Sequence, residues 1–227
     1  MESTRSKRDD ARILVIAWVA LVAAVVAVGW LLTHPLESTV DPWDDEVVLW
    51  FADHRASALD PVADIGSKIA DTVVGLAVAA VLSITTWRRL HTWRPAAFYG
   101  VLVAGTLALY LVVTAVIPRD RPPVEILDPG LVPDHSFPSG HVATAIVVYC
   151  ATAVLLGAYV PRWRRWSWLL FLVPLVVAPS RLYQGAHHPT DVLTSMVFAS
   201  IWLAVVSRVL LPAPRSVRED TADKVEA

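Results

Sequence analysis

Long apolar blocks separated by short polar segments dominate this chain. Six blocks are long enough, or nearly so, to cross a hydrocarbon layer about 30 Å thick. They cover residues 13–32, 69–86, 96–117, 140–158, 166–180 and 191–211. The fifth block is short and contains Pro174 and Pro179, so it either ends below the membrane surface or spans with help from nearby interfacial tryptophans. The pattern predicts an all-α integral membrane protein, a bundle of six transmembrane helices.

The composition agrees with a membrane protein. Hydrophobic residues make up 56% of the 227 positions and the mean hydropathy is +0.54, values that soluble domains rarely reach. The formal net charge of −2 gives no indication of a nucleic-acid partner. Cys150 is the only cysteine, so the chain cannot form an intrachain disulfide.

The chain divides into a short N-terminal segment, a membrane domain and a tail. Residues 1–12 are rich in basic side chains, and the apolar run that follows is longer than a typical signal-peptide core, which favours a retained first helix. Residues 13–211 form the predicted membrane domain. Residues 212–227 are charged and are predicted to be a disordered tail. Within the mixed segment 34–66, the apolar run 47–51 could form a short amphipathic helix lying on the membrane.

The distribution of basic residues predicts the orientation in the membrane. With the N-terminus in the cytoplasm, 14 of the 19 Lys and Arg residues fall on the cytoplasmic side, as the positive-inside rule requires. Both termini are then cytoplasmic, and the polar clusters at the helix ends face outward. The five basic residues left outside are Arg55, Lys68, Arg119, Arg121 and Arg181. Three of them belong to those polar clusters, where anion binding would explain their position.

A polar cluster opens the fourth apolar block, at residues 137–141. Ser139 is a good helix N-cap, and Gly140 lets a ligand approach the backbone closely. The free N–H groups of the first helical turn favour an anion there, and His141 lies in that turn. Taken alone, the segment is explained equally well as an ordinary capped helix with an incidental histidine.

A second cluster precedes the sixth block. Pro189 fits the first position of a helix, which puts His187 just before the helix and Asp191 in its first turn. The four-residue spacing lets the Asp191 carboxylate reach one ring nitrogen of His187 and leaves the other free to attack a substrate. His188 competes on composition but lacks that spacing. The alternative is an interfacial histidine beside an aspartate that the helix dipole favours.

Three arginines complete the clusters. Arg119 and Arg121 end the third block, and Arg181 ends the fifth; each guanidinium can donate paired hydrogen bonds to phosphate oxygens or can anchor lipid headgroups. A metal site is the other alternative, but nearby arginines would repel a divalent cation. Its candidate ligands would be Asp134, His135, His141, His187, His188 and Asp191. The combined inventory of guanidinium groups, helix N-terminus, histidines and aspartate suits hydrolysis of a phosphate ester.

These residues resemble the three signatures of the type 2 phosphatidic acid phosphatase (PAP2) superfamily, in order and in spacing, and they fall within residues 114–191. The signatures here are Arg121-Pro122, Pro138-Ser139-Gly140-His141, and Ser180-Arg181 followed by His187 and Asp191. The first signature departs from the family pattern. Family members usually have a lysine seven residues before the arginine of this Arg-Pro signature. Counted back from Arg121, that position is Thr114 in this chain. Arg119 or Lys68 would then replace that phosphate contact.

The resemblance implies a PAP2-type helical bundle and a mechanism. His187 would attack phosphorus and become a phosphohistidine, Asp191 would orient it, and His141 would protonate the leaving oxygen and then activate water. The phosphate-binding residues would be Arg121, Arg181, Ser139, Gly140 and, in place of the lysine, Arg119. The arginines supply the positive charge, so neither a metal nor another cofactor is expected.

The expected protein is a multi-pass phosphatase of the bacterial plasma membrane that takes a lipid phosphate from the bilayer. Phosphatidic acid, phosphatidylglycerol phosphate and a polyprenyl diphosphate such as undecaprenyl diphosphate all fit the sequence. A phosphotransferase of the same superfamily is one alternative. A non-catalytic transporter or binding protein for phosphorylated lipids is another, and Thr114 is the feature that favours it. Retention of His141, His187 and Asp191 together argues against it, because binding alone needs no oriented nucleophile.

Overall fold

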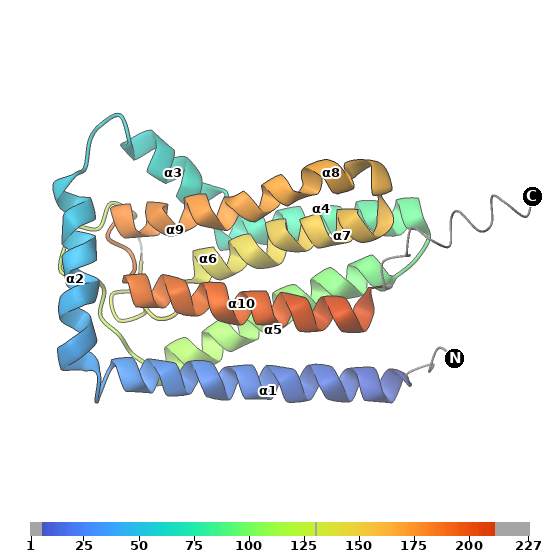
Figure 1. Ribbon diagram of the computed structural model, residues 1–227, viewed down its shortest axis with the longest axis horizontal. Helices are drawn as coiled ribbons and strands as arrows, with labels where there is room; N and C mark the ends of the chain where they lie inside the picture. The colour runs from blue at the N-terminus through green and yellow to red at the C-terminus, as the bar shows by residue number, and fades with distance from the viewer. Residues whose placement is uncertain (1–5, 130, 212–227) are drawn as a thin grey trace, which may run out of the picture.

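The computed structural model describes residues 6–129 and 131–211, which form a helical bundle (Figure 1). The helices along the long axis of the bundle are α1 (Lys7–Leu32), α4 (Thr72–Leu90), α5 (Arg94–Val116), α6 (Gly140–Ala145), α7 (Ala151–Tyr159), α9 (Val173–Tyr183) and α10 (Pro189–Leu210). The remaining elements are α2 (Glu37–Asp53), α3 (Asp60–Lys68), the π-helical turn η1 (Ile146–Cys150), the 3₁₀ turns η2 (Pro161–Trp163) and η3 (Trp168–Leu172), and α8 (Arg164–Ser167). The described residues contain no strand, only one isolated bridge between Arg119 and His135. The all-α prediction is therefore confirmed.

The predicted spans coincide with helices of the structure. Five segments are long and apolar enough to cross a membrane: Lys7–Leu32, Arg94–Val116, Gly140–Tyr159, Arg164–Tyr183 and Pro189–Leu210. The sixth is a broken span in which α3 and α4 bend by 49° relative to each other. The protein is thus an integral membrane protein with five spans, or six when the bent pair is counted.

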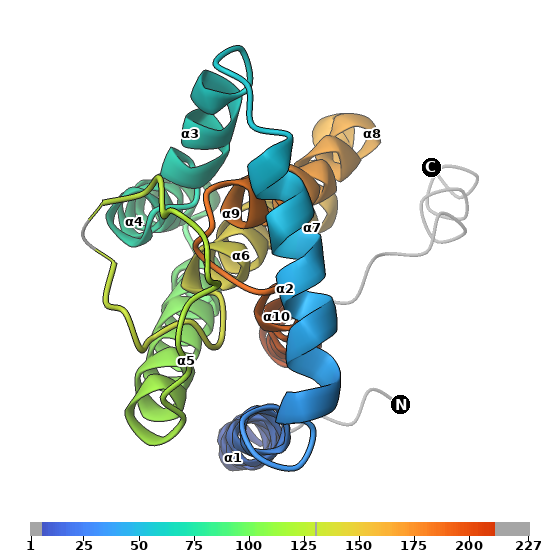
Figure 2. The ribbon, with the colours of Figure 1, turned by 90° about the vertical axis from the view of Figure 1, so that its left-hand side faces the viewer.

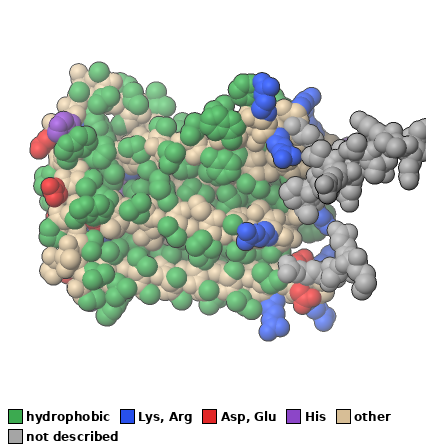
Figure 3. Space-filling model, viewed as in Figure 1, with side chains coloured by type: hydrophobic (Ala, Val, Ile, Leu, Met, Phe, Trp, Pro, Cys, Tyr) green, Lys and Arg blue, Asp and Glu red, His purple; other side chains and the backbone are tan. Residues whose placement is uncertain are grey.

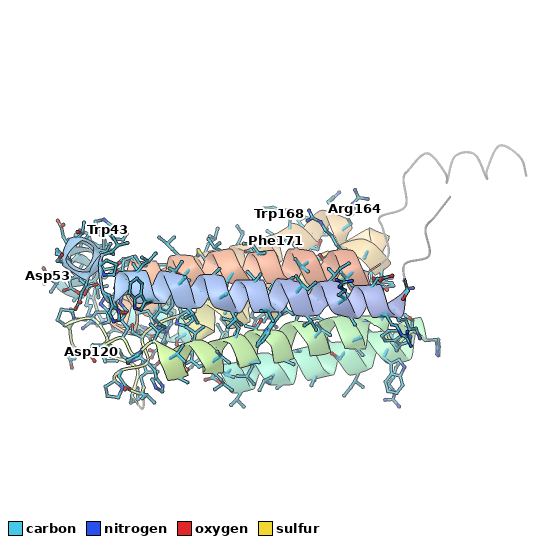
Figure 4. All side chains as sticks on the ribbon, turned by 90° about the horizontal axis from the view of Figure 1, so that it is seen from below. Trp43, Asp53, Asp120, Arg164, Trp168 and Phe171 are labelled. Carbon is cyan, nitrogen blue, oxygen red and sulfur yellow. The ribbon has the colours of Figure 1, made fainter. Side chains whose placement is uncertain are left out.

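The short fifth block gains length from its neighbours. The chain continues through α8, η3 and α9 as one segment of 20 residues. This length favours a segment that crosses the membrane over one that ends below the membrane surface. Pro174 lies in the first turn of α9, where a missing N–H removes no helix hydrogen bond, whereas Pro179 lies inside the helix. In Figure 4, Trp168 and Phe171 point away from the bundle, as side chains in contact with lipid would.

The two ends of the bundle differ in structure and charge. α2, the loop after α5 and the turn between α9 and α10 gather at one end, while α1 begins and α10 ends at the other (Figures 1 and 2). Figure 3 shows Lys and Arg side chains mainly at the end away from α2, and hydrophobic side chains over the length between. This asymmetry agrees with the charge pattern on which the predicted orientation was based.

The predicted amphipathic run at 47–51 lies within a longer helix, α2. Val48 is fully buried against the bundle, whereas Leu49 and Trp50 are exposed. Figure 2 shows α2 crossing the end of the bundle in front of α9 and α10. The helix itself is confirmed, and its contact with the membrane surface stays a prediction. The predicted tail, residues 212–227, lies outside the described residues, and α1 begins at Lys7, inside the predicted N-terminal segment of residues 1–12.

Two glycines allow the close contacts that surround the polar end. A Cβ at Gly66 would lie 2.1 Å from the Ser180 hydroxyl oxygen, so only glycine lets α3 pack this tightly against α9. Gly185 follows α9 with φ +69°, a left-handed conformation that glycine adopts readily, and a Cβ there would meet Val124. The first contact holds α3 against α9, and the second holds the loop after α5 against Gly185. Both lie close to the start of the loop that contains His187.

Candidate active site

A cavity lies at the α2 end of the bundle, between α4, α5 and the helix that begins with α6. Its volume is about 270 Å³. The polar groups on its wall come from Tyr110, Arg121, Gly140, His141 and His187, together with threonines of α4, α5 and α6. The apolar part of the wall is formed by Leu76, Val103, Leu107, Leu131, Ala143, Val147 and Val148. Each predicted cluster thus contributes to the wall of this cavity, through Arg121, through Gly140 and His141, and through His187. Ser139 and Arg181 are not among the described residues that line it.

Arg121 is anchored to backbone carbonyl groups on two loops. Its Nε donates to Val132 O at 2.9 Å, its Nη2 donates to His135 O at 3.1 Å, and its Nη1 donates to Ala186 O. These contacts tie the loop after α5 to the segment just before His187. Burial lowers the pKa of Arg121, an effect that the neighbouring Tyr110 hydroxyl opposes. The guanidinium nevertheless keeps its charge at neutral pH, because the unperturbed pKa is above 12.

Arg181 is fully buried and is held from one side only. Its Nη1 donates to Asp128 Oδ2 and to Gln184 Oε1, both at 2.7 Å, and to the Ser67 hydroxyl. Its Nε and Nη2 find no acceptor among the described residues. These two nitrogens present parallel N–H bonds along one edge of the guanidinium, the geometry that binds two oxygens of one phosphate. A buried charge with two idle donors is a costly arrangement unless an anion binds there.

Ser139 occupies the N-cap position that the sequence predicts, but its hydroxyl does not cap the helix. The side chain makes no hydrogen bond to the first turn of α6, and the buried Oγ has no partner among the described residues. A Cβ at Gly140 would lie 3.3 Å from Cε2 of Tyr110, so the backbone here runs tightly against α5. The Ser139 hydroxyl and the first-turn amides of α6 are thus available to an anion.

His187 has a defined tautomer. Its Nδ1 lies 2.7 Å from the carbonyl oxygen of Ser136, which can only accept, so Nδ1 carries the proton. Nε2 is left with a free lone pair, and the residue lines the cavity. Burial lowers the pKa of His187 to about 4; Asp191 opposes this shift, and the charges of Arg181 and Arg121 add to it. The imidazole is therefore neutral at pH 7. His141 lies on the same cavity wall, in the first turn of α6.

Asp191 lies beside His187, but it contacts the histidine less directly than its spacing predicts. Its Oδ2 is 3.7 Å from His187 Nδ1, an ion-pair distance that is too long for a hydrogen bond. Oδ2 accepts instead from the Ser136 hydroxyl at 2.6 Å and from the His188 backbone N–H at 2.8 Å. Ser136, which sequence reasoning missed, therefore links the two: its hydroxyl donates to Asp191 and its carbonyl accepts from His187.

His188 also lies close to Asp191, although it lacks the four-residue spacing on which His187 was preferred. Its Nδ1 lies 3.4 Å from Asp191 Oδ2, and its Nε2 lies 3.5 Å from Asp45 Oδ1 on α2. His188 is not among the described residues that line the cavity. What separates the two histidines is therefore the direction of the side chain, toward α2 for His188 and toward the cavity for His187.

Arg119 also differs from its expected role. Its guanidinium donates to Asp191 Oδ1 at 2.6 Å, to Asp44 Oδ2 at 2.8 Å, to Asp41 Oδ1 at 2.9 Å and to Thr190 Oγ1 at 2.7 Å. Burial alone would lower its pKa, but the charges of Asp191 and Asp44 outweigh burial and raise it. Arg119 is not among the described residues of the cavity wall. A phosphate contact by Arg119 is not supported, because its guanidinium is paired with three carboxylates, which would repel a phosphate.

The other candidates for the missing lysine are not on the cavity wall either. The Thr114 hydroxyl bonds to the Tyr110 carbonyl at 2.9 Å and is buried within α5. Lys68 is exposed at the end of α3. Among the described residues, no group of three or more His, Cys, Asp or Glu side chains is arranged to hold a metal ion. Of the proposed metal ligands, Asp134 is exposed in the loop after α5, with His135 3.8 Å away.

Residues 95–214 match the profile of the PAP2 superfamily, and this match covers more than half of the chain. The chain belongs to the PAP2 superfamily.

Two relatives share 30% sequence identity with the chain. One is the undecaprenyl-diphosphatase BcrC of Bacillus subtilis (strain 168), similar over 152 residues that make up 65% of this chain and 73% of BcrC. The other is an undecaprenyl-diphosphatase of Sulfolobus acidocaldarius, similar over 148 residues, 62% of this chain and 65% of the relative.

A solved structure shares the fold. The crystal structure of a transmembrane PAP2-type phosphatidylglycerolphosphate phosphatase from Bacillus subtilis matches with a TM-score of 0.69 at 22% identity. The match covers 86% of this chain and 92% of that structure. The helical bundle predicted from the apolar blocks is therefore the fold of a known membrane phosphatase.

Proposed function

We propose that this protein is a membrane phosphatase that removes phosphate from a lipid phosphate or diphosphate through a phosphohistidine intermediate. The observation that carries the proposal is the fully buried Arg181, whose Nε and Nη2 have no partner among the described residues. The Ser139 hydroxyl is idle in the same way. Arg181 is near enough to His187 for its charge to lower the pKa of that histidine, and His187 has a free Nε2, so the two together suit a phosphoryl group.

The first chemical step is attack of His187 Nε2 on phosphorus. A nitrogen–phosphorus bond forms, the bond to the leaving oxygen breaks, and His141 donates a proton to that oxygen. In the second step, His141 takes a proton from water, whose oxygen displaces the histidine and releases inorganic phosphate. Arg121, Arg181, Ser139 and the Gly140 amide stabilise the charge on the three equatorial oxygens in both steps.

The hydrogen bond from His187 Nδ1 to Ser136 O supports this role for His187. It fixes the ring so that Nε2, rather than Nδ1, carries the reactive lone pair. The charge that develops on the imidazole as phosphorus is attacked is balanced by Asp191, 3.7 Å away. Asp191 thus acts on His187 mainly through charge and through Ser136.

The cavity supports a substrate with an apolar tail. Below the polar groups its wall consists mainly of side chains such as Val103, Leu107 and Val147, which favour hydrocarbon over water. Because both 30%-identical relatives are named undecaprenyl-diphosphatases, we infer that a polyprenyl diphosphate is the preferred substrate. Phosphatidylglycerol phosphate and phosphatidic acid are the competing lipids in the test below.

Tyr110 offers a neutral replacement for the missing lysine. It lies one helical turn before Thr114 on α5, and it lines the cavity beside Arg121 and Gly140. A phenol can donate a hydrogen bond to a phosphate oxygen but adds no positive charge. The site would then bind phosphate with two guanidinium groups and no ammonium.

We further propose that the α2 end faces outward and both termini face the cytoplasm. The charge pattern supports this orientation, since basic side chains gather mainly at the opposite end (Figure 3). A single cysteine introduced at Pro129 in a Cys150→Ser variant tests it. An impermeant maleimide should label this cysteine on intact cells, and labelling only after permeabilisation would reverse the orientation.

The catalytic proposal is tested by phosphate release from purified protein in detergent. The panel comprises farnesyl and undecaprenyl diphosphates, phosphatidic acid and phosphatidylglycerol phosphate, each with and without EDTA. We expect the prenyl diphosphates to be hydrolysed fastest, EDTA to have no effect, and His187→Ala to abolish release. His54→Ala, which alters an exposed histidine just after α2, is the matched control and should behave as wild type. Binding of these lipids without turnover would indicate a non-catalytic protein.

A further inference from the structure

A buried ion cluster connects α2 to the catalytic aspartate. The Arg119 guanidinium bridges Asp191 on α10 and Asp44 on α2, at 2.6 and 2.8 Å. Asp44 and Asp191 are both fully buried, and Arg119 is 6% exposed. Asp41 also contacts Arg119, but its side chain is 38% exposed, so water can replace that contact.

Asp44 is also bonded to the first turn of α10. Its Oδ1 accepts from the Thr190 backbone N–H at 3.1 Å, and its Oδ2 accepts from the Thr190 hydroxyl. A carboxylate at a helix N-terminus is stabilised by the free amides and by the helix dipole. Asp44 therefore fixes the start of the helix that carries Asp191 and, through Arg119, the carboxylate itself.

The charges of this cluster are buried, so breaking one of its ion pairs costs free energy that water cannot restore. A buried guanidinium needs an acceptor for each donor, and a buried carboxylate needs donors or a paired cation. If Asp44 lost its charge, Arg119 would lose its strongest acceptor other than Asp191, while Asp41 and Asp45 would remain nearby on α2. The guanidinium would shift toward α2 and away from the geometry in which it holds Asp191 Oδ1.

We propose that Asp44 is a positioning residue for the phosphatase reaction: through Arg119 it sets the orientation of the Asp191 carboxylate, and thereby of Ser136 and His187. Asp44 contacts neither the cavity nor a phosphate in this arrangement. Its effect passes along the chain Asp44–Arg119–Asp191–Ser136 to the histidine. This inference rests on the proposed function, because it assigns Asp44 a part in the nucleophilic step of His187.

The proposal predicts a particular kinetic change. Asp44→Asn keeps the size of the side chain and one acceptor but removes the charge that holds Arg119. We expect kcat to fall about tenfold or more, as when a charge-assisted contact is lost in a buried site, with KM changed less than threefold. Asp53→Asn on the same helix is the matched control, because Asp53 is exposed at the end of α2 (Figure 4) and should leave both constants unchanged.

A double-mutant cycle separates positioning from simple stabilisation of the fold. If Asp44 acts through Asp191, Asp44→Asn should lower kcat in the wild type but change it less than twofold in an Asp191→Asn background. Equal effects in both backgrounds would overturn the proposal, since a purely structural role is independent of the Asp191 charge. If Asp44→Asn does not fold, as judged by gel filtration in detergent, the same cycle is run with Arg119→Lys.

Failure of the proposed function would look different. If His187→Ala retains phosphate release, or if no acid-labile phosphoenzyme is trapped from the wild type, the phosphohistidine mechanism is wrong whatever Asp44 does. If His187→Ala is inactive while Asp44→Asn has wild-type kcat, the mechanism stands and the positioning role fails. The two results are therefore distinguishable in one set of assays.

Discussion

The ring of His187 is held by the backbone carbonyl of Ser136, at a distance of 2.7 Å from Nδ1, and not by the aspartate four residues later. The same serine donates its hydroxyl to Asp191 at 2.6 Å. A single loop residue therefore orients the proposed nucleophile with its backbone and the Asp191 carboxylate with its side chain.

Ser136→Ala should separate these two contacts. The substitution removes the hydroxyl bond to Asp191 but keeps the carbonyl that accepts from His187. A hydrogen bond to a buried carboxylate contributes about 1.5–3 kcal/mol, so kcat should fall about tenfold to a hundredfold with KM nearly unchanged. Steady-state phosphate release checks this, with Ser38→Ala at an exposed site on α2 as the control. An unchanged kcat would mean that Asp191 needs no help from Ser136.

The two adjacent histidines should differ in covalent labelling. His187→Ala should abolish both turnover and the acid-labile phosphoenzyme, because it removes the Nε2 that faces the cavity. His188→Ala should keep the phosphoenzyme and most of the turnover, since that side chain points toward Asp45 and its backbone N–H to Asp191 remains. Rapid quenching with a ³²P-labelled substrate measures both. The reverse pattern would move the nucleophile to His188.

Arg181→Lys should damage the site more than Arg121→Lys. Lysine cannot supply the parallel Nε and Nη2 donors that Arg181 leaves without a partner, whereas all three nitrogens of Arg121 already donate to carbonyls. We expect Arg181→Lys to lower kcat/KM and vanadate affinity on the order of tenfold to a hundredfold. Arg162→Lys, in the η2 turn far from the site, is the control. Equal losses of kcat/KM for Arg181→Lys and Arg121→Lys would contradict the proposal that Nε and Nη2 of Arg181 bind the phosphate.

The activity should tolerate mildly acidic conditions. Burial lowers the pKa of His187 to about 4, so this imidazole stays neutral, and nucleophilic, well below its ordinary pKa of about 6.5. As pH falls, kcat/KM should therefore remain nearly constant to about pH 5 and drop only as the pH passes through the folded-state pKa. A pH profile corrected for ionisation of the substrate measures this, and an acid limb near 6.5 would contradict it.

The Gly66 contact gives a prediction about stability. Gly66→Ala would place a methyl group 2.1 Å from the Ser180 hydroxyl oxygen and 3.0 Å from Ser180 Cβ, so either the hydroxyl gives up its bond to Val176 O or α3 shifts from α9. Overpacking of this kind costs about 1–3 kcal/mol, so thermal unfolding in detergent should occur at a lower temperature. Activity should fall too, because Ser67 would withdraw from Arg181. Gly100→Ala, where a Cβ meets nothing within 4 Å, should be neutral or slightly stabilising.

The arrangement of the spans was predictable because it depends on local composition. Burial of an apolar block in lipid is favourable wherever the block lies in the sequence, so length and hydropathy located the apolar part of each span. They did not locate the start of α1 at Lys7 or the bend between α3 and α4. The start of α10 at Pro189 and the placement of Ser139 at the N-cap were likewise set by the residues next to them. An alternation of spans then brought the polar clusters to one end of the bundle.

The roles of individual polar side chains were decided by the tertiary structure. Arg119 meets Asp44 across 75 residues of sequence and Asp191 across 72, and no local pattern marks such pairs. The sequence put Arg119 and Arg121 two residues apart and gave both the same chemistry. Only the packing of α2 over the end of the bundle turned Arg119 toward carboxylates and left Arg121 on the cavity wall.

His187 and His188 are a second pair of similar neighbours that packing turns in different directions. The four-residue spacing to Asp191 favoured His187 as the nucleophile. In the structure, however, both rings lie within 4 Å of Asp191, at 3.7 Å for His187 and 3.4 Å for His188. The choice between them depends on which ring faces the cavity, and that is set by Ser136 O on one side and Asp45 on the other. The sequence by itself determined which residues gather at this end of the membrane, because hydrophobic burial acts through local composition. The tertiary structure alone decided which of them line the cavity, because hydrogen bonds and ion pairs depend on the distances and directions that packing creates.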